Sequence, residues 1–306
     1  MAILTNVAIL GATGTLGRNL VSTLLQNGFA VTAISRPNGK PFCHPGVTNK
    51  VSSYDDVDEL TSALAHQHAV IEAFNPASAK YQSVIVRASI SAGVKHIITP
   101  DFSSDTFNPH ADELMIFEPK IRAQRELESA VGSTNGTISW TAVIVGAWYD
   151  WAIENGQFWI DKKTRTITRC GSGNQKVSIS RLALCGEAVV AVLRSPDQYR
   201  NRPAYFHSHA VSTNELIAMV KEISGDDWEI VDVPLDGFIE KAKAQWDEDS
   251  QNNTADRLST TAYRMLGTSA LFDEANRYNG DFSPKVEQGW DEDLDVLKVS
   301  LTRLLQ

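Results

Sequence analysis

Three glycines near the N-terminus have the types and spacing needed to bind a dinucleotide. The segment GATGTLG has the pattern G-x-x-G-x-x-G, after an apolar run at 6–10 and before an amphipathic run at 19–26. A strand that turns sharply into a helix needs glycines for the turn, for the approach of a pyrophosphate and for close helix packing. Amides at the start of that helix would face the phosphates. The residues expected to bind the cofactor here are Gly11, Thr13, Gly14, Thr15, Leu16 and Gly17.

Two basic residues after the second predicted strand bear on which dinucleotide binds. NAD sites usually place an Asp or Glu there for the ribose 2′-hydroxyl. Residues 1–54 contain no carboxylate, whereas Arg36 ends the strand and Lys40 follows four residues later. A guanidinium can bind a 2′-phosphate through charge-assisted hydrogen bonds. The sequence therefore favours NADPH/NADP+, with a solvated arginine at a strand end as the alternative.

A lysine at the predicted start of a helix could transfer a proton. Lys120 follows Pro119, at the beginning of helical pattern 119–131. The positive end of the helix dipole would lower the pKa of its ammonium group. Such a lysine could pass a proton while a nicotinamide passes a hydride. The residues alone leave open that Lys120 is a solvated surface lysine.

Other catalytic patterns are missing from the sequence. No Tyr is followed four residues later by Lys, so the Tyr–Lys couple of most short-chain dehydrogenases is absent. There is neither a nucleophile elbow nor metal-ligand spacing, so we expect no metal. The three cysteines, Cys43, Cys170 and Cys185, are too widely spaced to suggest a disulfide framework or a zinc site.

Apolar runs and helical patterns alternate through the first half of the chain. Strands are predicted at 6–10, 29–35, 50–54, 68–74 and 95–102, with helices at 19–26, 55–66, 79–93 and 119–131. This alternation predicts right-handed βαβ crossovers in a Rossmann-type, doubly wound parallel sheet. Ligands of such sheets lie beyond the carboxyl ends of the strands. Phe74, at the end of the fourth predicted strand, is therefore expected near the cofactor.

The second half of the chain has a different sequence pattern. A buried strand is predicted at 139–148, a hairpin with a Gly-rich turn at 163–180, and a helix at 212–225 whose Ser212 and Glu215 form a capping box. We predict an NADP-binding Rossmann domain at 1–147. Residues 148–306 would form a smaller α/β substrate-binding lobe, interleaved with the first domain and returning strands to the main sheet.

Composition limits the partners. The formal charge of −9 argues against nucleic acid, because nucleic-acid-binding proteins carry clustered positive charge. No apolar run approaches the roughly 20 residues that span a bilayer, and the N-terminus shows no secretory signal. We expect a cytoplasmic protein, monomer or homodimer, with a small-molecule substrate and neither a nucleic-acid nor a membrane partner.

Several segments together resemble one family. NVAILGATGTLGRNL, SAGVKHIITPDFSSD, KIRAQRELE and WTAVIVGAWYDW, with Arg36, are similar to isoflavone-reductase-like and NmrA-like proteins, which are atypical short-chain dehydrogenase relatives. The C-terminal half is most similar to fungal members. The resemblance implies that the glycine loop and Arg36 bind NADPH and that Lys120 matches the proposed catalytic lysine. It also places Thr99, Pro100 and Phe102 beside the cofactor and substrate.

Departures from the family pattern leave the substrate open. PDFSSD replaces the family's Pro-Ser-Glu-Phe-Gly turn, and Gln124 stands where an arginine often follows the lysine. Four aromatic residues could line a pocket for a flat aromatic substrate or form the core of the second lobe. They are Trp148, Tyr149, Trp151 and Phe158.

The resulting hypothesis is an NADPH-dependent reductase of a small aromatic or conjugated metabolite, with Lys120 as acid/base. One alternative is an NmrA-type regulatory protein that senses NAD(P) without turnover. Another is a non-redox isomerase or cyclase on the same fold.

Overall fold

The structure is a computed structural model that describes residues 4–39, 41–157, 159–225 and 227–306. Two predicted site residues, Lys40 and Phe158, lie outside the described residues. The chain forms two compact units, each assembled from separate segments. Unit 1 comprises the described residues up to Phe102, Pro119–Ile144 and Leu182–Ala204; unit 2 comprises Ser103–Glu118, Val145–Arg181 and Tyr205–Gln306. A substrate-binding role for 148–306 stays a prediction.

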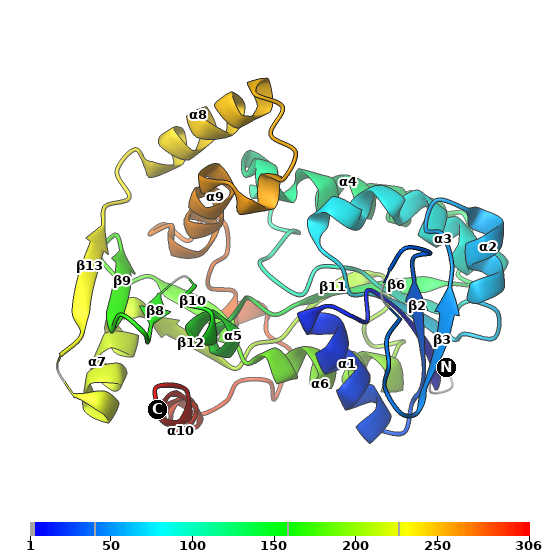
Figure 1. Ribbon diagram of the computed structural model, residues 1–306, viewed down its shortest axis with the longest axis horizontal. Coiled ribbons are helices and arrows are strands. Elements are labelled where there is room, and N and C mark those ends of the chain that lie inside the picture. The colour runs from blue at the N-terminus through cyan, green and yellow to red at the C-terminus, as the bar shows by residue number, and fades with distance from the viewer. Residues whose placement is uncertain (1–3, 40, 158, 226) are drawn as a thin grey trace. The chain divides into compact units, whose positions relative to one another are not determined.

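Unit 1 is built on one seven-stranded sheet (Figure 1). Its strands are β1 (Asn6–Leu10), β2 (Ala30–Ser35), β3 (Val47–Val51), β4 (Ala69–Glu72), β5 (His96–Ile98), β6 (Ser139–Ile144) and β11 (Arg202–Tyr205), in the order β11-β6-β5-β4-β1-β2-β3. All pairings from β3 to β6 are parallel. β4 and β6 are buried at every position, as expected for strands covered on both faces. The predicted Rossmann-type sheet is confirmed, and its strand order reverses between β1 and β4.

Helices cover both faces of this sheet. They are α1 (Thr15–Gln26), α2 (Val57–Ala63), α3 (Gln82–Ser91), which follows the short η1 (Pro76–Tyr81), α4 (Glu118–Gly132) and α6 (Leu182–Arg194). In Figure 1, α1 and α6 lie on one face of the sheet and α2, α3 and α4 on the other. Gly186 lets α6 approach α1 closely, because a Cβ there would lie 2.4 Å from the Thr23 hydroxyl oxygen.

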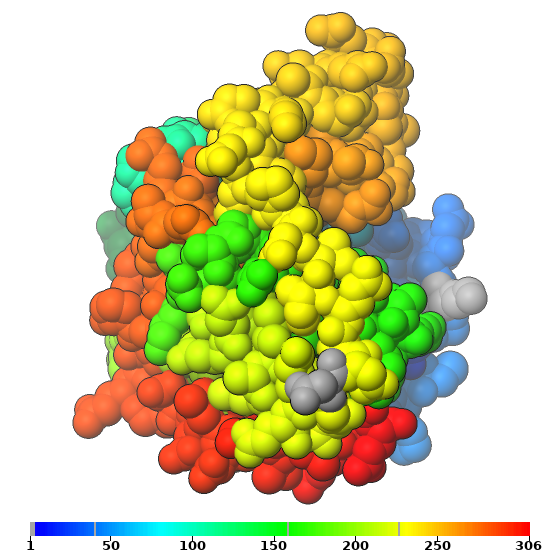
Figure 2. Space-filling model, turned by 90° about the vertical axis from the view of Figure 1, so that its left-hand side faces the viewer, coloured from blue at the N-terminus to red at the C-terminus, as the bar shows by residue number. Residues whose placement is uncertain are grey.

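In its described residues, unit 2 contains two three-stranded sheets and five α-helices. The first sheet has the order β12-β10-β7 and the second β13-β9-β8. The strands are β7 (Ala147–Trp148), β8 (Ile160–Asp161), β9 (Thr166–Cys170), β10 (Lys176–Ser180), β12 (His209–Ser212) and β13 (Glu229–Val233). The helices are α5 (Tyr149–Glu154), α7 (Thr213–Ser224), α8 (Phe238–Gln251), α9 (Thr261–Phe272) and α10 (Leu294–Leu304). Figure 2 shows one face of this unit, with α7 and β13 in yellow, α8 in gold and α10 in red. The predicted capping box of Ser212 and Glu215 is confirmed at the start of α7.

The predicted hairpin at 163–180 is wrong. β9 pairs with β13 and β8, whereas β10 pairs with β12 and β7. Gly171 and Gly173 both have positive φ, +59° and +72°. They lie in the turn between β9 and β10, so two strands adjacent in the sequence belong to different sheets.

Two other strand predictions need correction. The strand at 139–148 is broken at Gly146, whose φ is +69° and whose Cβ would lie 2.1 Å from the Ser178 carbonyl oxygen. The third strand is 47–51 rather than 50–54. It is an edge strand with every residue at least partly exposed, so no apolar run marks its start. In the described ranges, we find no helix both long and apolar enough to cross a membrane.

Candidate functional site

The three loop glycines have different structural roles. Gly11 has a φ of +91°, and a Cβ there would lie 2.4 Å from the Ala73 carbonyl oxygen, just after β4. A Cβ at Gly17 would lie 2.3 Å from the Gly11 carbonyl oxygen. The protein's own packing therefore requires both. Gly14 has an ordinary φ of −75°, and its Cβ would meet only the Gly11 carbonyl oxygen, at 3.6 Å. Because Gly14 is also exposed, its lack of a side chain leaves room for an approaching ligand.

The start of α1 is suited to an anion. Gly14 is the N-cap, makes no side-chain capping bond, and is followed by a first turn without acidic residues. Uncapped amides and the helix dipole at such an end favour a phosphate. Thr13 and Thr15 are exposed beside this end and Leu16 is half-buried, while the Arg18 side chain donates to the Thr13 carbonyl at 3.0 Å.

Arg36 lies at a hollow of 390 Å³ between the ends of β2 and β3. The lining residues are Arg36, Pro37, Asn38, Gly39, Ser53, Tyr54, Asp55 and Tyr81. The Tyr54 hydroxyl donates to the Ile34 carbonyl at 2.6 Å, and its ring meets the Tyr81 ring edge to face. Burial raises the pKa of Tyr54 to about 12, so this hydroxyl stays neutral. The hollow joins a guanidinium to an aromatic wall, which suits a phosphorylated nucleoside.

Asp55 lines the same hollow, which the sequence did not predict. It is the first carboxylate of the chain, yet pairing of β2 with β3 brings the residues after both strands together. The hollow therefore offers a cation for a phosphate and an acceptor for an amino group.

Lys120 is buried, and the alternative of a solvated surface lysine is wrong. It is the third residue of α4 and is 8% exposed, and its ammonium donates to the Asp101 main-chain carbonyl at 2.9 Å. Burial lowers the pKa of Lys120, while the Asp101 carboxylate acts in the opposite direction. The predicted lowering is thus present, but desolvation is its main cause instead of the helix dipole.

The segment after β5 contains Asp101, whose carbonyl accepts the Lys120 hydrogen bond. Thr99 and Pro100 are buried, and the Thr99 hydroxyl donates to the Asp101 carboxylate at 2.6 Å. Phe102 is fully buried with a φ of +40°, and its amide donates to the Val143 carbonyl at 2.8 Å. A bulky residue in this left-handed region is strained by roughly 1–3 kcal/mol and persists only where its surroundings fix it. Such strain is typical of functional loops.

A second buried acid stands at the end of β4. Glu72 is 0% exposed, and the Gln82 side-chain amide donates to its carboxyl at 2.9 Å. Burial raises the pKa of Glu72 to about 8, and the nearby Asp101 charge adds to the effect. The sequence motifs did not predict this residue. Its signal is an acid inside the apolar strand pattern HAVIEAF.

The aromatic residues after β6 belong to unit 2. Tyr149 is buried in the core of that unit, and its hydroxyl donates to the Ser300 hydroxyl at 3.0 Å. Trp148 and Trp151 are half-buried and meet edge to face, with ring centroids 6.3 Å apart. Tyr149 is therefore a core residue; a substrate pocket formed by these aromatics stays a prediction.

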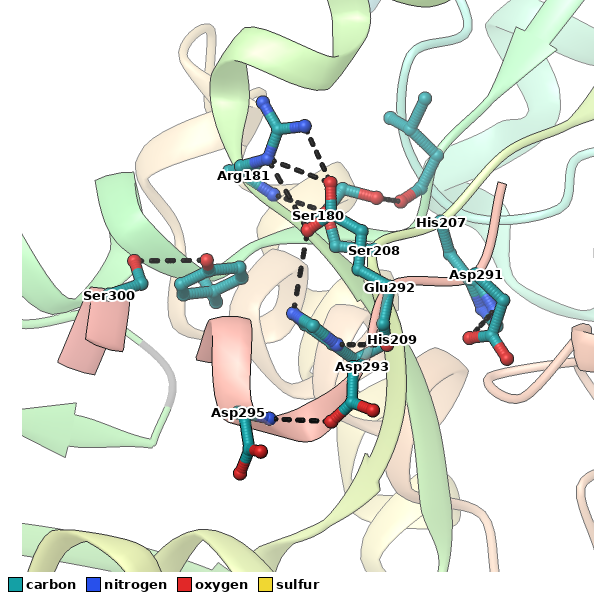
Figure 3. A network of polar contacts seen from close by, with 12 residues as sticks. Ser180, Arg181, His207, Ser208, His209, Asp291, Glu292, Asp293, Asp295 and Ser300 are labelled. Carbon is teal, nitrogen blue, oxygen red and sulfur yellow. Dashed lines mark hydrogen bonds and ion pairs between the residues drawn. The ribbon is translucent and has the colours of Figure 1, made fainter. Parts of the chain in front are cut away.

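A polar network in unit 2 serves the fold. The Arg181 guanidinium lies 2.5 Å from the Glu292 carboxylate, and the His209 ring nitrogen lies 3.0 Å from the Glu292 carbonyl oxygen (Figure 3). These contacts attach the segment before α10 to β10 and β12. No cluster of His, Cys, Asp or Glu suited to a metal occurs among the residues that the structure describes.

The strand order and the glycine loop at the β1–β4 switch point define a Rossmann-type fold, and the same unit carries the buried Lys120. The chain belongs to the NmrA-like family, whose model matches residues 5–299. It is 28% identical over 240 residues to "Oxidoreductase poxI" of Penicillium oxalicum, covering 77% of this chain and 75% of that protein.

Solved structures share the fold over nearly the whole chain. A structure of AtPrR2 with NADP+ and (+)pinoresinol has a TM-score of 0.74 at 17% identity, covering 99% of this chain and 100% of that one. A crystal structure of isoflavone reductase has a TM-score of 0.72 at 18% identity, covering 98% of each chain. At these identities, the likeness shows a common fold.

Proposed function

We propose that this protein is an NADPH-dependent reductase of a small aromatic or conjugated metabolite. The observation that carries the proposal is the buried Lys120 ammonium on the Asp101 carbonyl, in the unit that carries the glycine loop. The oxidoreductase name of the Penicillium relative and the NADP+ in the AtPrR2 structure support it.

The residues present fit an NADP cofactor. Room at Gly14 and the uncapped start of α1 suit a pyrophosphate, and the hollow at Arg36 suits a 2′-phosphate. Phe74, Thr99, Pro100 and Phe102 would border the nicotinamide half, because they follow β4 and β5 at the carboxyl edge of the sheet. When bound, NADPH supplies a hydride to the substrate.

Lys120 would complete the reduction. The atom that gains electron density as the substrate accepts a hydride needs a proton, and the Lys120 ammonium holds one. Burial favours release of that proton, since it lowers the pKa of the ammonium. The Asp101 carbonyl orients the group through its hydrogen bond. General acid catalysis of this kind contributes about 10²–10⁴-fold to a rate.

The test combines binding with turnover. Aromatic and conjugated carbonyl compounds are screened for NADPH consumption by the wild type, by Lys120→Ala and by Lys95→Ala, an exposed-lysine control. We expect Lys120→Ala alone to lose turnover while keeping NADPH affinity. Full turnover by Lys120→Ala would remove the lysine from the reaction. NADPH binding without consumption would favour the regulatory alternative, and conversion of a compound without consumption would favour the isomerase or cyclase.

A further inference from the structure

Glu72 is a buried carboxyl group that the proposed reaction does not use. It is fully buried, and among the described residues the Gln82 amide is its hydrogen-bond partner. Its second carboxyl oxygen is buried without a hydrogen bond from the described part of the chain. A negative charge in these surroundings is very unfavourable, so the group favours its uncharged acid form.

Glu72 lies at the switch point of the sheet, where β4 pairs with β1. In the sheet register it stands opposite Leu10, the residue before the glycine loop. The carbonyl of the following residue, Ala73, packs against Gly11. On the other side, the register Ile71–Ile98 places Glu72 beside Thr99, at the start of the segment that leads to Asp101. Glu72 thus lies between the loop expected to hold the phosphates and the segment that holds Lys120.

The groups around Glu72 set the pH at which its carboxyl group ionises. The Asp101 charge raises the pKa of Glu72 and the Gln82 hydrogen bond lowers it, with burial as the largest cause of the net rise to about 8. The Lys120 ammonium, on α4, donates a hydrogen bond to the Asp101 main-chain carbonyl. Tyr54, near Gly11, keeps its proton up to about pH 12. Burial moves the pKa of Glu72 upward and that of Lys120 downward, so the Glu72→Gln variant is what isolates the charge change of Glu72.

We propose that Glu72 is a positioning residue of the cofactor site, an uncharged acid whose ionisation repels the dinucleotide phosphates and weakens NADPH binding at alkaline pH. This inference rests on the proposed function, because it requires NADPH to bind at the β1–β4 switch point. If ionisation of Glu72 lowers NADPH affinity, linkage requires that the Glu72 carboxyl group bind its proton more tightly when NADPH is bound. Cofactor and proton would then favour each other.

The test is NADPH affinity as a function of pH, followed by the fluorescence of the seven tryptophans. The range runs from about pH 7 to about pH 9.5, above the second pKa of a phosphate monoester near 6. Wild type should lose affinity roughly tenfold over this range. Glu72→Gln, an uncharged isostere, should keep the affinity seen near pH 7 throughout. Glu126→Gln, which changes an exposed acid on α4, should behave as wild type.

A second variant tests the direction of the pH effect. Gln82→Leu removes the hydrogen bond that favours the charged form, so the midpoint of the affinity loss should move to higher pH. It also decides the question if Glu72→Gln does not fold. A pH-independent wild type, an unchanged midpoint in Gln82→Leu, or an unchanged profile in a folded Glu72→Gln would overturn the inference alone. Absence of NADPH binding near pH 7 would overturn the proposed function as well.

Discussion

The ammonium of Lys120 donates a 2.9 Å hydrogen bond to the main-chain carbonyl of Asp101, joining the first turn of α4 to the segment after β5. Both residues are buried, at 8% and 7% exposure. A lysine is rarely buried without a reason, because desolvation of its charge is costly. The relationship therefore predicts a conflict between stability and activity at this position.

Replacement of Lys120 by methionine should separate the two properties. Methionine fills a similar volume without a charge, so the denaturant midpoint should be unchanged or higher. Turnover of an accepted substrate should fall about 10²–10⁴-fold, since the proton donor is lost. Chemical denaturation and steady-state rates on one preparation check both. A strongly destabilised Lys120→Met would instead give the lysine a structural role.

Alanine at each loop glycine should give different outcomes. Gly14→Ala should fold with a stability loss of about 1 kcal/mol or less, because its Cβ meets no close atom. It should still lose NADPH affinity, since the methyl group would occupy the approach of the pyrophosphate. Gly17→Ala places its Cβ 2.3 Å from a backbone oxygen and should be severely destabilised. Thermal unfolding and NADPH titration of both variants distinguish ligand space from packing. Normal NADPH affinity in Gly14→Ala would contradict the assignment.

The buried acid at the end of β4 should make stability depend on pH. The pKa of Glu72 rises from 4.5 to about 8 on folding. The unfolded chain therefore releases this proton at lower pH than the folded chain does. Its contribution is fully present below about pH 4.5 and is lost as pH rises through about 8, by up to about 5 kcal/mol. The denaturant midpoint of the wild type should fall over this window relative to Glu72→Gln. Parallel profiles for the two proteins would show that Glu72 does not carry the effect.

The sequence predicted the parts of the fold that local patterns encode. β1 and the glycine loop are contiguous, and the apolar runs of β2, β4 and β6 mark strands buried on both faces. β3 is shifted because an edge strand has no apolar run. The division of β9 and β10 between two sheets depends on partners β13 and β12, which lie far along the chain.

The site residues that stand in local sequence motifs could also be predicted. These residues are Gly14, Arg36 and Lys120. Asp55 joins the Arg36 hollow only through the pairing of β2 with β3. Only the register of β4 with β1 and β5 shows that Glu72 lies between the glycine loop and the segment after β5. An acid inside the apolar pattern HAVIEAF marks Glu72 as unusual, but no local pattern shows which residues the sheet register brings next to it.

The most direct measurement is the affinity for NADPH and NADH of the wild type and of Arg36→Met, by tryptophan fluorescence near pH 7. Arg36 lies at the hollow expected to hold the 2′-phosphate, and a charge-assisted contact of this kind is worth about 1.5–3 kcal/mol. The wild type should bind NADPH at least roughly tenfold more tightly than NADH, and Arg36→Met should lose that preference by weakening NADPH alone. Equal affinity of the wild type for both cofactors, or an unchanged preference in Arg36→Met, would contradict the account.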